Sequence, residues 1–500
     1  MKVNKNRHIF RNIGIGIVLI WLFMVGILIR EVSFDHADEE ARAPLDSMSA
    51  VASDQRDWME IYLKDKKVGY SVNRISPAGE DYLIHEEIFL RLNLLGQANS
   101  MHSVSRSLVD GQFFLKNFSF MMSSGAVTFQ VSGRVKQDLM LLEVGGKGLR
   151  RQESLRLKGP PVIGSGMPHF FRGRRLRIGD FFKFPAFDPS TMAQREIVMK
   201  VAAMETIVVN RIKYPAFRLD AEVWGQPMTF WLDKEGRVLK EKGLMGLTLV
   251  RSSAANAPRD LEGAGGEDFY EIAAIDAGRA LQRPDRLRYL KLKVEGLAGT
   301  GFDAALLGMG RQRFNSGILE VFQEKVPSVA GWCIPYQDPT KEMGPYLGPE
   351  WNIESDHEEI VKKAMELAGK EKNPVTVARR FMAWVYGSLE KRPVITVPSA
   401  LEVLKTGVGD CNEHATLLTA LLRACGIPAR LCVGLVYSRG KFFYHAWVES
   451  YLGTWISMDP TLNQMPADAT HLKLVQGGLD RQAEIIGLIG RLGLKVIDYK

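Results

Sequence analysis

Apolar and polar residues alternate with a period of two through much of the first half of the chain. The apolar run from Trp58 to Leu63 is followed by a polar turn and a second run from Val68 to Val72, and apolar residues alternate again from Val127 to Val131. A period of two is typical of strands that bury one face. Because these short runs are separated by glycine, aspartate and asparagine, we expect an all-β sandwich or open barrel across residues 56–251.

The pattern changes to helical spacing near residue 355. Three residues that favour the N-cap, Ser355, Asn373 and Ser399, each precede a predicted helix. The two serines are followed three positions later by glutamate, which is the capping-box pattern, and Asn373 is followed by proline, which favours the first turn. A fourth helix is expected from Cys411 to Cys425, where leucines repeat at helical spacing before a glycine and a proline end it.

Three apolar strands are expected after this helix. They cover Ala429 to Tyr437, Phe442 to Tyr451 and Trp455 to Met458, and the first two are joined by a turn at Arg439 and Gly440. Helices followed directly by strands distinguish this part of the chain from the β-rich first half.

The N-terminal segment predicts a membrane anchor. Residues 13–29 contain no charged residue and, with Ile9 and Phe10, approach the roughly 20 residues that span a bilayer. Basic residues precede the segment and acidic residues follow it, so the positive-inside rule predicts a single-pass protein of the inner (cytoplasmic) membrane, with the bulk of the chain on the periplasmic side. A cleaved signal peptide is the alternative, but the apolar stretch is long for one and no small-residue cleavage site directly follows.

These patterns divide the chain into successive parts. A stretch rich in alanine, glycine and serine follows the β-rich region and has the composition of a linker. The predicted parts are a cytoplasmic tip and transmembrane anchor at 1–30, a linker at 31–55, the β-rich domain at 56–251, a linker at 252–268, a small mixed and partly β segment at 269–345, a domain of helices and strands at 346–478 and a C-terminal tail at 479–500.

Composition limits the classes of function. The 500 residues are 46% hydrophobic and 24% charged, and this length predicts about three domains. The 65 Lys and Arg exceed the 57 Asp and Glu by 8, but the surplus is spread out and no basic motif is interleaved with aromatics, so no nucleic-acid partner is expected. Four cysteines do not make a disulfide framework. No cofactor or metal is expected, and the sequence makes no prediction of oligomeric state.

Three residues in the last third have the chemistry and the positions of a cysteine nucleophile and its partners. Cys411 lies at a predicted helix start, where the helix dipole and unpaired amides favour the thiolate, the reactive form of cysteine. His445 lies on the second predicted strand, and Asp459 ends the third, where its carboxylate reaches the second nitrogen of the histidine ring. This arrangement predicts nucleophilic acyl transfer, with Cys411, His445 and Asp459 as the catalytic triad.

Four motifs surround these residues. In order they are Gly409-Asp410-Cys411-Asn412-Glu413-His414-Ala415, Gly426-Ile427-Pro428-Ala429-Arg430, Tyr444-His445-Ala446-Trp447-Val448-Glu449 and Met458-Asp459-Pro460-Thr461. In order, spacing and flanking residues they resemble the bacterial transglutaminase-like superfamily over residues 346–478. The anchored, β-rich N-terminal part also resembles the layout of exported members, with much lower specificity.

The resemblance implies a papain-like α+β domain. In it Cys411 attacks an amide or thioester carbonyl, His445 relays the proton and Asp459 orients His445, with the Cys411 backbone amide as an oxyanion donor. In animal transglutaminases an upstream tryptophan assists the oxyanion; Trp384 is the nearest upstream tryptophan here, and its helical register favours core packing instead. No acidic loop matches the calcium sites of those enzymes, so no calcium dependence is expected.

We therefore expect a membrane-anchored exoplasmic enzyme that acts on amide bonds of peptide or protein substrates through a Cys411 acyl-enzyme. Hydrolysis of the protease or amidase type is favoured, and amine transfer by a transglutaminase stays open because the same triad supports both. An alternative function is binding, in which the β-rich region holds an envelope lipid, glycan or protein and the transglutaminase-like domain is accessory.

A zinc site is a second alternative for the same residues. It would combine Cys411 and His414 with either Cys432 or His445. This set lacks the paired short motifs of structural zinc and gives Asp459 no role. His414 is better explained by helix packing one turn from Cys411.

Overall fold

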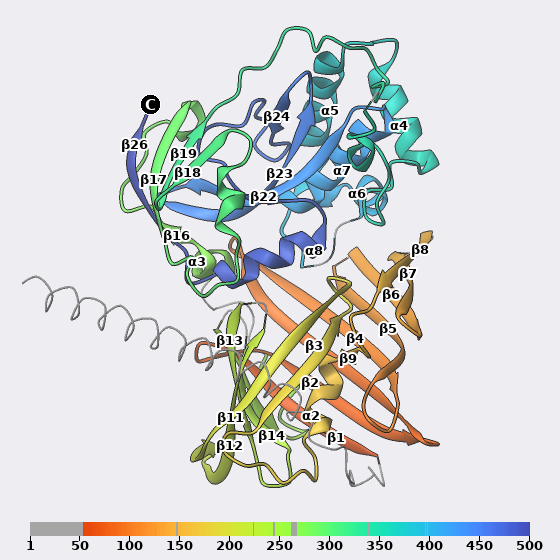
Figure 1. Ribbon diagram of the computed structural model, residues 1–500, viewed down its shortest axis with the longest axis vertical. Helices are drawn as coiled ribbons and strands as arrows, with labels where there is room; N and C mark the ends of the chain where they lie inside the picture. The colour runs from red at the N-terminus through yellow and green to blue at the C-terminus, as the bar shows by residue number, and fades with distance from the viewer. Residues whose placement is uncertain are drawn as a thin grey trace, which may run out of the picture. The chain divides into compact units, whose positions relative to one another are not determined.

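The computed structural model describes residues 54–500, apart from 126, 147–148, 224, 244–245, 262–267, 339, 396 and 398. The described residues belong to one compact unit. They are mostly β-structure, with the helices gathered in the C-terminal part of the chain (Figure 1).

A single 15-stranded sheet is built from the first half of the described chain. Its order runs from β8 through β1 to β15 and then back through β10 to β9, so most neighbours in the sheet are also neighbours in sequence. The pairing is antiparallel except between β9 and β10. The strands are β1 (Gln55–Leu63), β2 (Lys66–Ala78), β3 (Asp81–Leu94), β4 (Gln97–Val109), β5 (Leu115–Ser124), β6 (Val127–Lys136), β7 (Leu139–Gly146), β8 (Leu149–Arg156), β9 (Val162–Ile163), β10 (Phe181–Asp188), β11 (Ala193–Val209), β12 (Ile212–Val223), β13 (Gln226–Leu232), β14 (Val238–Lys242) and β15 (Leu247–Ser252).

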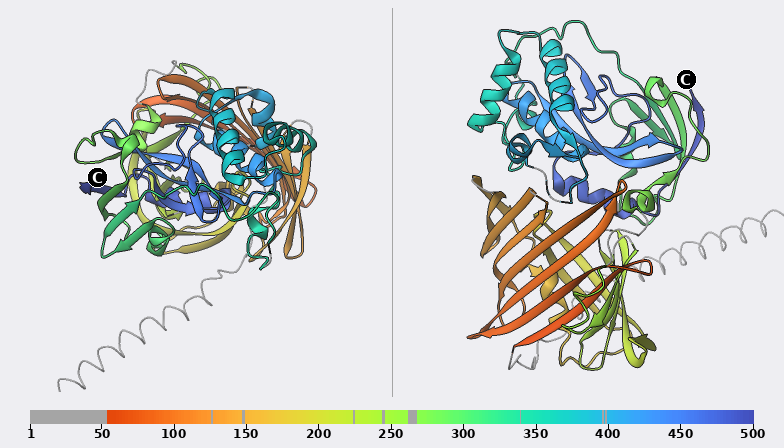
Figure 2. Two further views of the ribbon diagram at one scale, coloured as in Figure 1. Left: turned by 90° about the horizontal axis from the view of Figure 1, so that it is seen from above. Right: turned by 180° about the vertical axis from the view of Figure 1, so that it is seen from behind.

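This sheet curls until strands far apart in its order face one another (Figure 2). The rings of Phe118 on β5 and Phe187 on β10 have centroids 5.2 Å apart. A short helix, α2 (Met167–Phe170), is tied to the inner face, since Asn73 on β2 contacts both the backbone oxygen of Ser165 and Nε2 of His169. The β-rich region is therefore one open, curled sheet and not two stacked sheets.

The second half combines helices with a smaller antiparallel sheet. In this sheet the strands follow in the order β16, β23, β22 and β25. The strand β24 also pairs with β23, along a different stretch of it from β16. The helix α7 packs against β22 and β23 and is itself covered by three further helices. The elements are α4 (Glu358–Ala368), α5 (Pro374–Ser388), α6 (Ala400–Thr406), α7 (Cys411–Ala424), β16 (Ile275–Asp276), β22 (Ala429–Ser438), β23 (Lys441–Tyr451), β24 (Trp455–Met458) and β25 (Leu472–Gln476).

A third sheet, of four strands, includes the C-terminal end of the chain. Its order is β18, β19, β17 and β26, and the last of these lies in the segment predicted as a tail. The strands are β17 (Tyr289–Glu295), β18 (Gln312–Asn315), β19 (Ile318–Phe322) and β26 (Gly493–Tyr499), and the remaining elements are α3 (Phe269–Ala273), α8 (Leu479–Gln482), β20 (Glu390–Lys391) and β21 (Val408–Gly409).

The helix starts follow from local chemistry. Asn373 and Ser399 cap α5 and α6 by accepting hydrogen bonds from backbone amides of the first turn, which confirms these two predictions. The start of α4 was predicted wrongly, because the cap is His357, whose side chain accepts from the amide of Glu359, and not Ser355. The α7 helix is buried from Glu413 to Arg423, and its leucines join the main core of the C-terminal half.

The predictions that depended on a transmembrane helix need correction. Residues 13–29 lie outside the described part of the chain. Among the residues that the structure describes, no helix is long and apolar enough to cross a membrane. The longest there, α5, has 15 residues, against the roughly 20 that a span requires. This contradicts the predicted fold class, which began with an N-terminal transmembrane helix, and the predicted single-pass inner-membrane location.

Candidate active site

Cys411 is the first residue of α7, and the turn before it is held by reciprocal hydrogen bonds. Asp410 is the N-cap, and its Oδ1 accepts from the amide of Asn412 at 2.9 Å. Glu413 Oε2 in turn accepts from the amide of Asp410 at 2.9 Å, which completes a capping box. A Cβ at Gly409 would lie 2.2 Å from Cβ of Glu413, so the residue before the cap has to be glycine.

The capping box leaves one amide of this turn available. Glu413 donates its amide to the Asp410 side chain, and the His414 amide bonds the Asp410 carbonyl at 3.1 Å. Within the described part of the chain, the Cys411 amide is the one at this helix start without a hydrogen-bond partner. It therefore lies next to the thiol as a free donor.

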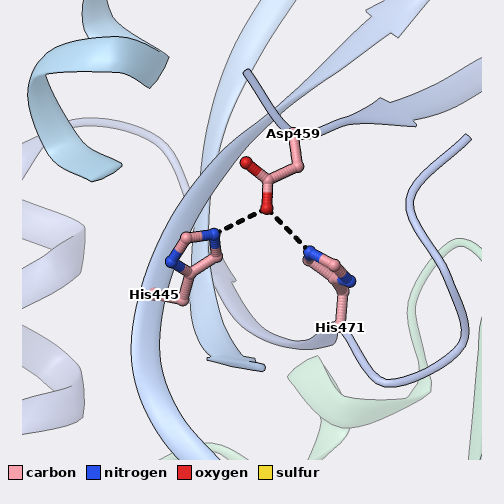
Figure 3. A group of neighbouring side chains, drawn as sticks. All are labelled: His445, Asp459 and His471. Carbon is pink, nitrogen blue, oxygen red and sulfur yellow. Dashed lines mark hydrogen bonds and ion pairs between the residues drawn. The ribbon is translucent and has the colours of Figure 1, made fainter. Parts of the chain in front are cut away.

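His445 lies on β23, which packs against the start of α7. The backbone amide of Ala446, the next residue, acts on the Cys411 thiol and lowers its pKa. His445 Nε2 lies 2.7 Å from Oδ2 of Asp459, and because an ionised carboxylate only accepts, this nitrogen donates (Figure 3). Nδ1 is then the nitrogen that remains for the thiol.

Asp459 directly follows β24 and is fully buried. Its Oδ1 accepts from the backbone amides of Thr461 at 2.7 Å and Leu462 at 3.0 Å, while Oδ2 accepts from His445. Although burial raises the pKa of Asp459, the charge of His445 and the hydrogen bonds from both neighbouring histidines lower it well below its ordinary value. Asp459 is therefore a fixed anion.

A second histidine, His471, contacts the same carboxylate from the opposite side. Its Nε2 lies 2.9 Å from Oδ2 of Asp459, and its Nδ1 lies 3.3 Å from Oδ1 of Asp468 (Figure 3). Although burial lowers the pKa of His471, the hydrogen bonds to Asp459 and Asp468 raise it to about 9. Both ring nitrogens face carboxylates, so His471 is a buried imidazolium.

The sequence analysis missed His471 and Asp468. His471 precedes β25, which pairs with β22 through a register irregularity next to Gly434, the partner of His445 in the β22–β23 ladder. A Cβ at Gly434 would lie 1.9 Å from the carbonyl oxygen of Leu472, so this glycine allows β25 to approach. The spacing Asp468-x-x-His471 before an apolar run was the only signal, and it did not show which strand β25 joins.

Tyr270, on α3, also contacts the candidate site. Its hydroxyl donates to Oδ2 of Asp410 at 3.0 Å, and burial together with the charge of Asp410 raises the pKa of Tyr270 well above its ordinary value. Burial, followed by the charge of Asp410, raises the pKa of the Cys411 thiol well above its usual range, against the effect of the backbone amide of Ala446, which lowers it. The helix-start argument alone thus misjudged this thiol, because it ignored burial among carboxylates.

The other residues singled out in the sequence take structural positions. Nδ1 of the buried His414 donates to the carbonyl of Asp410 at 2.7 Å, and burial lowers its pKa. Cys432 is buried on β22, and its thiol hydrogen-bonds Glu449. Trp384 packs against the core of the C-terminal half, with Nζ of Lys363 5.4 Å from its ring centroid.

One group of described residues has the composition of a metal site. His445, Asp459 and His471 place one potential ligand atom each within 4.8 Å of one another. The contacts from the two histidines to Oδ2 of Asp459, at 2.7 and 2.9 Å, are hydrogen-bond lengths. A zinc ion would need about 2.0–2.2 Å to each ligand and would have to replace these hydrogen bonds. The structure does not bring together the zinc set considered from the sequence.

Comparison with known proteins supports the class of the domain. Residues 361–460 match the model of the transglutaminase-like superfamily, which confirms the transglutaminase-like domain predicted within 346–478. The chain therefore contains a transglutaminase-like domain, which supports a cysteine-dependent enzyme at the level of that family. No curated protein matches the chain.

Solved structures match parts of the chain at low similarity. A candidate cysteine protease from Cytophaga hutchinsonii shares 18% identity, covers 43% of this chain and 86% of its own, and has a TM-score of 0.27. A β-barrel-like protein of the family DUF1849 from Brucella abortus shares 12%, with coverages of 39% and 94% and a TM-score of 0.29. The periplasmic domain of TgpA from Pseudomonas aeruginosa shares 15%, with coverages of 38% and 83% and a TM-score of 0.24.

Proposed function

We propose that this protein is a cysteine-dependent acyl-transfer enzyme that acts on amide bonds of peptides or proteins through an acyl-enzyme on Cys411. The observation that carries this proposal is the fixed hydrogen bond from His445 Nε2 to the buried anion Asp459, with the backbone amide of the next residue, Ala446, acting on the Cys411 thiol and lowering its pKa. Asp459 thus orients the imidazole, and the thiol lies at the start of α7, the helix that packs against the strand of His445.

The first half-reaction forms a thioester. Nδ1 of His445 takes the thiol proton, and the Cys411 sulfur attacks the carbonyl carbon of the amide. The resulting imidazolium is stabilised by Asp459, and it donates the proton to the leaving amine as the carbon–nitrogen bond breaks. The free amide of Cys411 donates a hydrogen bond to the oxyanion.

The second half-reaction depends on which nucleophile reaches the thioester. Water gives a carboxylic acid and completes a hydrolysis, whereas a primary amine gives a new amide and completes a transfer. His445 removes a proton from either nucleophile, and the thiol of Cys411 leaves. We favour hydrolysis, and the same residues serve both outcomes.

The test incubates the purified full-length protein with a peptide library that contains glutamine side chains, with and without a primary amine, and analyses the products by mass spectrometry. Chain scission indicates a protease, and loss of ammonia with or without amine incorporation indicates a transferase or a side-chain amidase. A thioester adduct should appear on the peptide that contains Cys411. Cys333, which is exposed, is the internal control and should carry none. Product formation that persists in Cys411→Ala would contradict the proposal.

A further inference from the structure

The curled sheet encloses a cavity of about 1210 Å³ that the catalytic proposal does not use. Its walls are largely apolar, as in sites that hold the chain or ring of an organic ligand. The apolar lining comes from strands on both sides of the curl and from the segment around α2, and includes Ile88, Phe120, Met122, Phe171, Met199 and Phe230.

One wall of the cavity carries small polar residues, whose short side chains leave the space open. Ser103 and Ser105 on β4 lie opposite Ile88 and Glu86 of β3 in the sheet register, and all four line the cavity. Ser105 is only 6% exposed, and its hydroxyl has no hydrogen-bond partner among the described residues. A buried hydroxyl left unpaired destabilises the fold, which indicates a partner for it inside the cavity.

Six carboxyl groups line the same cavity, among them Glu86 and Glu241, together with the basic side chains of Lys158, Arg195 and Arg481. Glu86 lies on β3 and Glu241 on β14, and the curl of the sheet brings them close enough for the charge of Glu86 to act on Glu241. Burial raises the pKa of both side chains to about 7. In the described part of the chain neither carboxyl group forms a hydrogen bond or an ion pair.

The carboxyl groups of Glu86 and Glu241 are both only partly buried at the cavity wall, and neither has a partner among the described residues. Carboxyl groups in apolar surroundings are normally paired with a cation or bonded to several donors. Other buried carboxylates in this chain follow that rule, since Glu449 is bonded by both Arg430 and Lys473. The contrast indicates that Glu86 and Glu241 meet a donor that the chain itself does not provide.

We propose that the cavity binds an amphiphile with an apolar chain and a protonated amine head. The apolar chain of the amphiphile packs against the apolar wall, and its ammonium group pairs with Glu86 and Glu241. The hydroxyl of Ser105 lies on the same wall and is a further hydrogen-bonding group for the ligand. An alcohol head supplies no positive charge, and a carboxylate head would bring a negative charge next to Glu86 and Glu241. The site shares no residue with the candidate triad.

The experiment measures binding of decylamine, decanol and decanoate to the full-length protein by isothermal titration calorimetry below their aggregation concentrations. Decylamine should bind at least about tenfold more tightly than decanol, because a hydrogen bond to a charged group stabilises more than a neutral one, and decanoate should bind most weakly. Equal affinity for decylamine and decanol would indicate a neutral-lipid cavity and would overturn the proposal, as would no binding of any of the three.

Near-isosteric variants separate charge from shape. The double variant E86Q/E241Q should bind decylamine about as weakly as decanol while retaining its affinity for decanol. Glu87→Gln is the matched control, because Glu87 is next on β3, bonds His102 and does not line the cavity. Circular dichroism and the melting temperature check that each variant folds. Unchanged decylamine affinity in a folded E86Q/E241Q variant would contradict the assignment. If the variant does not fold, the comparison of the three head groups on the unmodified protein still tests the proposal.

Discussion

Asp459 is the residue on which the hydrogen bonds of the site converge. One of its oxygens accepts from two backbone amides and the other from two histidines. An asparagine in its place would keep the shape, but its NH₂ group cannot accept a hydrogen bond from the backbone amides or the histidines that it would face. The carboxylate also supplies the negative charge that stabilises the imidazolium formed on His445.

We therefore predict that Asp459→Asn lowers kcat by roughly 10²–10⁴-fold, the range expected when a histidine loses its orienting carboxylate. KM should change much less, because Asp459 is buried behind His445 and does not reach the substrate. Steady-state kinetics on a peptide found in the product screen checks this, with Asp356→Asn, at an exposed side chain, as the control. A kcat within a factor of two of the wild type would contradict the role given to Asp459.

The raised pKa of His471 predicts that the stability of the protein depends on pH. Its folded pKa of about 9 is raised above the ordinary value of 6.5, so its contribution is fully present below pH 6.5 and is lost as pH rises through 9. The full contribution is on the order of 3 kcal/mol from the size of the shift. Urea unfolding between pH 6 and pH 10 should show a fall in the free energy of unfolding that is much smaller in His471→Asn. Parallel curves for the two proteins would show that His471 is not a cation in the folded state.

Asp410 combines two effects that a pair of variants separates. Its side chain caps α7, and its negative charge raises the pKa of Cys411. Asp410→Asn keeps a good N-cap and removes the charge, so the pKa of Cys411 should fall while stability changes little. Asp410→Ala should also cost about 1 kcal/mol of stability. The alkylation rate of Cys411 as a function of pH, measured in a Cys333→Ala background, gives the pKa; a pKa that is unchanged or higher in D410N would contradict this explanation.

At the scale of elements, the position of β25 decides whether His471 reaches the site. Gly434 has no room for a side chain, since a Cβ would lie 1.9 Å from the carbonyl oxygen of Leu472. Gly434→Ala should push β22 and β25 apart, destabilise the protein by about 1–3 kcal/mol and reduce activity.

Gly387→Ala is the matched control for this substitution. Gly387 lies in α5 and nothing surrounds its Cβ position within 4 Å, so the added methyl should leave stability unchanged or raise it by up to about 1 kcal/mol. Thermal unfolding and kcat of both variants provide the readout. Equal stability of the two variants would show that the close approach of β25 is not a constraint.

Elements with local signals were predictable and those that depend on distant pairing were not. The caps at Asn373 and Ser399 follow from two or three neighbouring residues, so the sequence located them. The predicted cap at Ser355 failed because a histidine two residues later also accepts from a first-turn amide. The contact of His471 with Asp459 depends on the register of β25 on β22, which no local pattern encodes.

At the scale of the whole molecule, the sequence indicated many short strands but not how they close. A sandwich and a single curled sheet share the same alternation, and the choice depends on the pairing of β1 with β15, which joins residues about 190 positions apart in the chain. The cavity depends on that closure, because Glu86 and Glu241 come together only when the sheet curls. Tyr270 was missed for a similar reason, since it belongs to a segment near a predicted linker.

The central claim is that His445 activates Cys411, and differential thiol labelling tests it most directly. The full-length protein is treated with iodoacetamide at pH 6, and modification of each cysteine is followed by peptide mass spectrometry. Cys333 is exposed and serves as the ordinary thiol in the same sample, whereas Cys425 and Cys432 are buried. We predict that replacing His445 by alanine slows the reaction of Cys411 several-fold and leaves that of Cys333 unchanged. A Cys411 that reacts equally fast with and without His445 would contradict the account.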